Sequence, residues 1–152
     1  MHAISLVLQT KSLIFDDYYW VNILDNKNEI MGIVQHTNFM DKQNYDNNHI
    51  IYVYNYFPIN DKKIKLTKDE IYNFYLKNLK KIDPNIESKI KKYDIFFGPY
   101  AQPIFDKEFL KNKPDFKTPR KNFFIANLDM TYPYDRGTNY AVKLGKNVSD
   151  YF

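Results

Sequence analysis

Hydrophobic and polar residues alternate at the start of the chain. Within residues 3–10, Ile4, Leu6 and Leu8 occupy every second position. This period of two is typical of a half-buried β-strand, because successive side chains point to opposite faces of a sheet. The pattern predicts a first strand over residues 3–10.

The next hydrophobic segments predict a hairpin and a further strand. Residues 18–24 and 30–39 flank the polar stretch 25–28, Asp-Asn-Lys-Asn, which is rich in turn-forming residues. Residues 50–57 alternate again and place Tyr52, Tyr54 and Tyr56 on one face of a fourth strand.

The period then changes from two to about 3.6. Thr67 and Glu70 have the spacing of a capping box, with Thr67 as the N-cap. The buried face of the helix that follows consists of Ile71, Phe74, Tyr75, Leu79 and Ile82. Pro84 ends this helix and can begin a second, short one.

The remaining segments predict two short strands and a closing helix. We expect strands over residues 94–98 and 123–127, a short helix and loop over 106–119, and a helix over 138–151. Grouped strands followed by helices are typical of the α+β class. We therefore expect an antiparallel or mixed sheet of about five to six strands, helices on one face and a C-terminal helix.

Composition excludes several kinds of site. There is no cysteine and there are only 4 glycines, so zinc–thiolate sites and a glycine-rich phosphate loop are not expected. His2, His36 and His49 lack metal-ligand spacing, and no metal site is predicted. The net charge of +4 is spread along the chain and mixed with acids, so nucleic acid is not an expected partner. No apolar run reaches the length of a membrane span and no signal segment is evident, so we expect a cytoplasmic protein.

The most informative segment is a turn that leads directly into the last helix. It reads Tyr-Pro-Tyr-Asp-Arg-Gly-Thr-Asn-Tyr-Ala-Val-Lys-Leu-Gly over residues 132–145. The exposed amides and positive end of such a helix can bind an anion or the polar edge of a ring. An ordinary capped helix would have the same pattern.

This segment resembles the C-terminal flavin motif of FAD-dependent amine oxidoreductases, in the branch related to protoporphyrinogen oxidases and UDP-galactopyranose mutases. Four further matches occur in the same order, over residues 18–23, 36–39, 49–54 and 100–104. The resemblance implies a substrate-domain-like region over residues 1–121. It also implies that residues 122–152, a strand, turn and helix, complete a flavin-binding domain.

The resemblance also implies the site residues. Those near the FAD ring would be Asp135, Arg136, Gly137, Thr138 and Asn139. In the family one face of the sheet covers the flavin and binds substrate; the corresponding candidates are Trp20, Asn22, His36, Asn38, Tyr52, Tyr54 and Gln102. Each of these can equally be a structural residue of the sheet, and no catalytic residue is identified.

A complete enzyme of this family also has a G-x-G-x-x-G turn between a strand and a helix, which binds the FAD pyrophosphate. The sequence lacks that turn. The expectation is a truncated C-terminal fragment or subunit of an oxidoreductase, inactive alone, with only part of the FAD site. Its partner would be a dinucleotide-binding chain, or a second copy joined through an exposed docking face. The alternative is a stand-alone module that binds a polar or sugar-like molecule on an aromatic sheet face.

Overall fold

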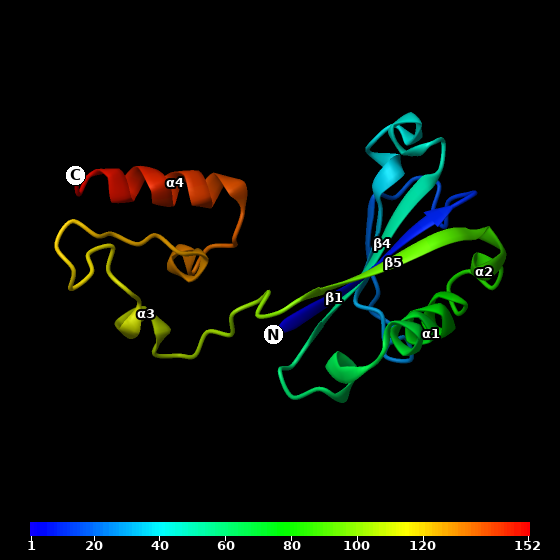
Figure 1. Ribbon diagram of the computed structural model, residues 1–152, viewed down its shortest axis with the longest axis horizontal. Helices are drawn as coiled ribbons and strands as arrows, with labels where there is room; N and C mark the ends of the chain where they lie inside the picture. The colour runs from blue at the N-terminus through cyan, green and yellow to red at the C-terminus, as the bar shows by residue number, and fades with distance from the viewer. The chain divides into compact units, whose positions relative to one another are not determined.

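The computed structural model describes residues 1–152 and contains two compact units, Met1–Gln102 and Pro103–Phe152 (Figure 1). The sequence-based division lay between residues 121 and 122, whereas residues 103–121 belong to the C-terminal unit. Aromatic contacts account for the difference. The Phe105 and Phe109 rings lie 4.5 and 5.3 Å from the ring of Tyr132, measured between centroids.

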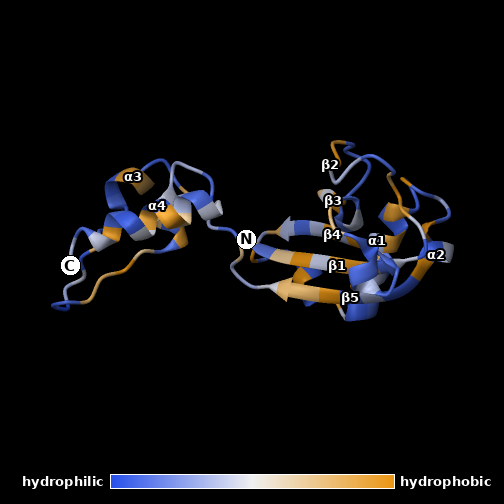
Figure 2. Ribbon diagram, turned by 90° about the horizontal axis from the view of Figure 1, so that it is seen from above, coloured by the Kyte–Doolittle hydropathy of each residue, from blue (hydrophilic) through white to orange (hydrophobic).

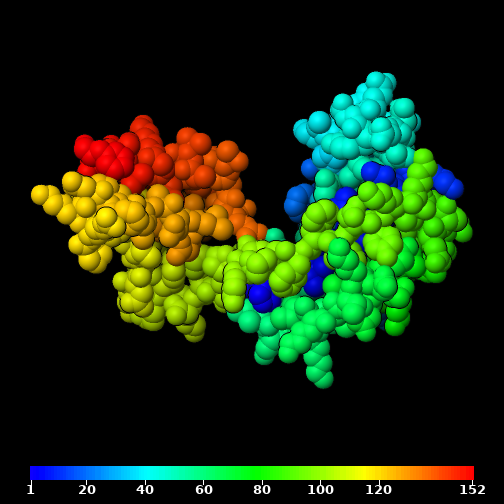
Figure 3. Space-filling model, viewed as in Figure 1, coloured from blue at the N-terminus to red at the C-terminus, as the bar shows by residue number.

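The first unit is built on a five-stranded antiparallel sheet. The strands are β1 (His2–Thr10), β2 (Trp20–Asn22), β3 (Gly32–Gln35), β4 (His49–Phe57) and β5 (Ile90–Gly98), in the order β2-β3-β4-β1-β5. β1 pairs with β4 on one side and with β5 on the other. In the space-filling view only small areas of its blue atoms are visible among later segments (Figure 3).

One face of the sheet carries the core. Ile4, Leu6 and Leu8 of β1 are buried and pack with apolar side chains of β3 and β4. Helices α1 (Lys68–Leu79) and α2 (Ile86–Lys89) contribute residues to the same core, and they lie together on one side of the sheet (Figure 1). The end of β5 is apolar and is orange in Figure 2. The predicted α+β class, with its antiparallel sheet and C-terminal helix, is confirmed.

Helix α1 begins where the capping box predicts. The Thr67 hydroxyl accepts a hydrogen bond from the Glu70 amide, and the Glu70 carboxylate accepts one from the Thr67 amide at 2.8 Å. The Thr67 hydroxyl also donates to this carboxylate, and the bonds that the carboxylate accepts from the Thr67 amide and hydroxyl lower the pKa of Glu70. Further along the helix, the buried Tyr75 hydroxyl donates to the Ile4 carbonyl at 2.8 Å and ties α1 to the central strand.

The predicted hairpin forms, but its strands are shorter than the sequence pattern indicates. β2 and β3 pair over three residues each, and Asn28 donates its amide to the Asp25 carbonyl in the turn. After β3 the chain turns into a 3-10 helix, η1 (His36–Asn38). Two more 3-10 helices, η2 (Lys42–Tyr45) and η3 (Lys62–Lys65), flank β4.

The C-terminal unit has little core of its own. It contains α3 (Phe109–Asn112), the 3-10 helix η4 (Leu128–Thr131) and α4 (Thr138–Ser149), and Met130 is its only buried apolar residue. The predicted strand over residues 123–127 is wrong. A single bridge joins Lys117 to Phe124, because no continuous partner strand offers this segment a hydrogen-bonding ladder.

Candidate functional site

A cavity of about 440 Å³ lies at the N-terminal half of α4. Arg136, Gly137 and Thr138 line its rim, and Ala141 and Gly145 line it along the helix. Gly137 is the N-cap, and as a glycine it has no side chain to hydrogen-bond to the first amides of the helix. The first amides of a helix lack partners within the helix and carry partial positive charge, so this end suits an electron-rich group.

Small side chains give the cavity its shape. A β-carbon added to Gly145 would meet no atom within 4 Å, so the space beside this residue is open. Gly137, Ala141 and Gly145 are each four residues apart and therefore share one side of the helix. A planar group could approach the helix backbone closely along this side.

The five predicted cofactor residues divide into two groups. Arg136, Gly137 and Thr138 line the cavity, whereas Asp135 and Asn139 do not. The Asp135 carboxylate accepts a hydrogen bond from the Arg136 amide at 2.7 Å and so stabilises the turn. Asn139 folds back toward Gly137, where its Oδ1 would lie 2.4 Å from an added β-carbon.

A second cavity, a groove of about 470 Å³, lies on the open face of the sheet, opposite the core. Four of the predicted substrate residues, Trp20, Asn22, Tyr52 and Tyr54, line it. They meet because the register pairs Trp20 with Val34 and Val34 with Tyr52, which places alternate residues of three strands on one face. We call this cavity the open-face groove.

Two aromatic walls of the open-face groove share one amide. The Trp20 indole Nε1 donates to Asn22 Oδ1 at 3.0 Å, and the Tyr54 hydroxyl donates to the same oxygen at 3.4 Å. The two rings pack edge to face, with centroids 5.8 Å apart. Partial burial raises the pKa of Tyr54, so its hydroxyl stays protonated at neutral pH.

The other three predicted substrate residues lie outside the open-face groove. His36 and Asn38 are in η1, and neither they nor Gln102 line this cavity. His36 Nε2 and the Tyr45 hydroxyl form a hydrogen bond of 2.7 Å. The Asn38 side-chain amide lies 3.0–3.1 Å from three carbonyl oxygens of residues 15, 16 and 18, an arrangement that anchors the loop before β2.

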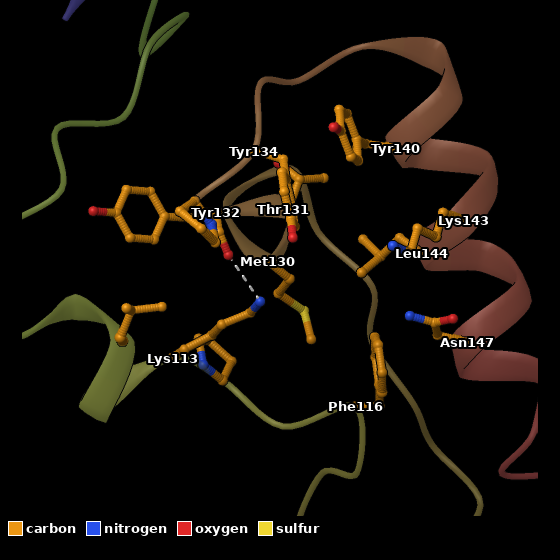
Figure 4. Close-up of a pocket in the computed structure, with 13 residues that line it drawn as sticks. Lys113, Phe116, Met130, Thr131, Tyr132, Tyr134, Tyr140, Lys143, Leu144 and Asn147 are labelled. Atoms are coloured by element: carbon orange, nitrogen blue, oxygen red, sulfur yellow. Dashed lines mark hydrogen bonds between the residues drawn. The ribbon is translucent and has the colours of Figure 1, made fainter.

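A third cavity, of about 390 Å³, lies in the C-terminal unit (Figure 4). Four of its lining side chains are aromatic, and the Tyr134 and Tyr140 rings stack with centroids 4.8 Å apart. Lys113 Nζ donates to the Tyr132 carbonyl at 3.1 Å, drawn as the dashed line in Figure 4. This cavity contains none of the five predicted cofactor residues.

Comparison of the chain with models of known protein families and with curated protein sequences finds no match. No helix combines the length and the apolar character that a membrane span requires. No group of three or more His, Cys, Asp and Glu side chains is arranged to hold a metal ion. The α4 cavity and the open-face groove are therefore the features of this chain that bear on its function.

Several residues that line the groove were not predicted by the sequence pattern. The floor includes Ala3 and Ser5 of β1 and Val34 of β3. Ala3 and Ser5 alternate with the buried Ile4, Leu6 and Leu8, so the pattern already placed small residues on the opposite face. Nothing in the pattern shows that this face is hollowed, because the hollow depends on which strand lies beside β1.

Proposed function

We propose that this chain supplies the substrate-domain sheet and the flavin-contacting helix of an FAD-dependent oxidoreductase. The observation that carries the proposal is the α4 cavity, which is lined by Arg136, Gly137 and Thr138 of the motif that resembles the family. Its volume of about 440 Å³ is within the range of small-molecule sites. In such an enzyme the flavin accepts a hydride from the substrate.

The residues of the α4 cavity are compatible with a flavin ring. Amides at the helix N-terminus stabilise negative charge on a bound ring edge, a contribution of about 0.3–2 kcal/mol. The small residues Ala141 and Gly145 leave space for a flat group. The roles of all five residues, 135–139, remain part of the proposal.

The proposal includes a second polypeptide segment that binds the dinucleotide. None of the four glycines falls in a G-x-G-x-x-G spacing, so the pyrophosphate contacts must come from elsewhere. The C-terminal unit is consistent with such a partner, because Val142 is 68% exposed and Ala141 is also exposed on α4. Only one apolar residue of this unit is buried, so packing its exposed apolar side chains against a further surface would stabilise the unit.

A titration of the full chain with riboflavin, which carries the ring without the adenylate, tests the flavin contact. We expect the backbone amide NMR signals of Thr138, Asn139 and Gly145 to shift with saturation. The second measurement is flavin absorbance of the chain purified alone and after co-expression with the protein encoded immediately upstream. Flavin retained only after co-expression supports the two-part enzyme, whereas unchanged amide signals at saturating riboflavin would rule out the α4 cavity as a ring site.

The open-face groove favours a second candidate function, a binding module that acts without flavin. Four aromatic side chains line it, which is typical of sites for small organic ligands. Saturable ligand binding at the groove, together with no response of α4 to riboflavin, would favour this alternative over the enzyme.

A further inference from the structure

The open-face groove has a specific chemical character. Its walls are the rings of Trp20, Tyr52, Tyr54 and Tyr56, and its floor contains small side chains of β1 and β3. None of the ten lining residues is Asp, Glu, Lys, Arg or His. The surface therefore offers ring faces and neutral hydrogen-bonding groups, without a formal charge.

Gly32 allows the wall at Tyr54 to adopt its position. The Tyr54 ring lies over this glycine, where an added β-carbon would be 2.4 Å from the hydroxyl oxygen and 2.6 Å from Cζ. Contacts this short are not tolerated, so any larger residue at position 32 would displace the ring. Because Trp20 and Asn22 also contact Tyr54, the walls are set before a ligand arrives, which lowers the entropy cost of binding.

The groove also contains polar groups that make no hydrogen bond within the chain. These groups are the Asn22 amide nitrogen, the Ser5 hydroxyl and the Tyr52 hydroxyl. Asn22 Oδ1, by contrast, already accepts a hydrogen bond from the Trp20 indole. Hydroxyl groups on a ligand would pair with these donors and acceptors. A purely hydrocarbon ligand would instead remove them from water without compensation, which costs roughly 1–3 kcal/mol for each group.

Binding of a charged ligand is also disfavoured, because the ligand would lose water without gaining an equivalent partner. An anion or cation that enters the groove loses hydration and meets no opposite charge among the lining residues. The net charge of +4 disfavours cations further, which offsets the attraction that aromatic rings offer them.

We infer that the open-face groove binds an uncharged ring that carries hydroxyl groups, as in a neutral sugar. The conclusion that a neutral sugar is the substrate rests on the proposed function, since the groove would be that enzyme's substrate site. The conclusion that the groove binds such a sugar does not, and it is tested separately. Sugar rings present apolar C–H faces to the aromatic walls and hydroxyl edges to Asn22 and Ser5.

The chain offers a direct reporter, because Trp20 is its only tryptophan. Three probes share one ring and differ in charge: methyl β-glucoside is neutral, methyl β-glucuronide is anionic and methyl β-glucosaminide is cationic. The corresponding galactosides and mannosides cover other hydroxyl arrangements. We expect Trp20 fluorescence to change with saturation for a neutral member. The charged members of that series should bind at least about tenfold more weakly than the neutral one.

Three variants connect binding to the geometry. Gly32→Ala displaces Tyr54 and should lower the affinity for the neutral sugar about fivefold. Asn22→Asp adds one negative charge and keeps the acceptor for Trp20, so the cationic probe should become the tightest of its series. Phe96→Ala is the control, because it removes an exposed ring from the same sheet face outside the groove, and binding should be unchanged.

Charged members that bind as tightly as the neutral one would overturn the inference, and so would the absence of saturation by any neutral glycoside. If Gly32→Ala does not fold, Asn22→Asp still decides, because unchanged selectivity in that variant contradicts binding in the groove. These outcomes are independent of the flavin proposal. If the groove binds no sugar, the response of α4 to riboflavin is unaffected and the flavin proposal stands. If the groove binds a sugar but α4 does not respond to riboflavin, only the binding-module function is supported.

Discussion

Position 145 separates helix stability from ligand binding. Gly145 lies inside α4, lines the α4 cavity, and has no atom within 4 Å of an added β-carbon. Glycine destabilises a helix interior by roughly 0.5–1 kcal/mol relative to alanine. Gly145→Ala and Gly145→Leu should therefore both stabilise α4, and the added β-carbon meets no steric obstacle within the chain.

The two variants should differ in their effect on the proposed flavin site. A leucine side chain extends into the space that the ring would occupy, and overpacking of this kind costs about 1–3 kcal/mol. That range corresponds to roughly 5- to 150-fold weaker riboflavin binding. Alanine adds a single methyl group and should change affinity much less.

Hydrogen exchange of the α4 amides and the riboflavin titration measure the two effects on the same samples. Val142→Leu is the matched control, because this exposed residue lies on α4 outside the cavity. Slower exchange with weaker binding in Gly145→Leu is the expected pattern. If Gly145→Leu binds riboflavin as tightly as the unmodified chain, the ring does not lie beside this helix.

Further predictions concern the first unit. Tyr75→Phe removes the buried hydrogen bond to the Ile4 carbonyl and should lower the free energy of unfolding by about 1–3 kcal/mol in urea. Thr67→Ala removes the N-cap of α1 and should lower the free energy of unfolding, measured in the same way, by about 1 kcal/mol. Since hydrogen bonds lower the pKa of Glu70, its contribution is complete above the unfolded-state pKa and is lost as the pH falls through the folded-state value, which thermal unfolding at decreasing pH measures. Asn38→Ala should cost about 1–2 kcal/mol and expose the loop before β2 to proteolysis, with groove binding unchanged if Asn38 is structural.

Much of the fold follows from local patterns. The alternation in β1 and β4 identified the buried face, because side chains in a strand alternate whatever their neighbours are. The start of α1 was also predictable, since Thr67 and Glu70 lie within one turn and cap each other directly. The turn that precedes α4 likewise follows from its own residues.

The candidate sites were only partly predictable. The sequence pointed to Tyr52 and Tyr54 as members of one face, but it also grouped His36 with them. In the structure β3 ends at Gln35, and His36 enters η1, where its ring bonds to Tyr45 and packs edge to face on Tyr52 at 5.5 Å, but it does not line the groove. The end of a strand depends on its partners, which a local pattern does not contain.

By itself the sequence determined which side of β1 and of β4 is apolar, where α1 begins, and that residues 132–145 form a turn followed by a helix. These features depend on residues close together in the chain. The tertiary structure decided that residues 123–127 form no strand, that Trp20, Asn22 and Tyr54 share one groove, and that Tyr54 lies over Gly32. Each of these depends on strand register and on contacts between residues distant in sequence, and such contacts exist only once the sheet has formed.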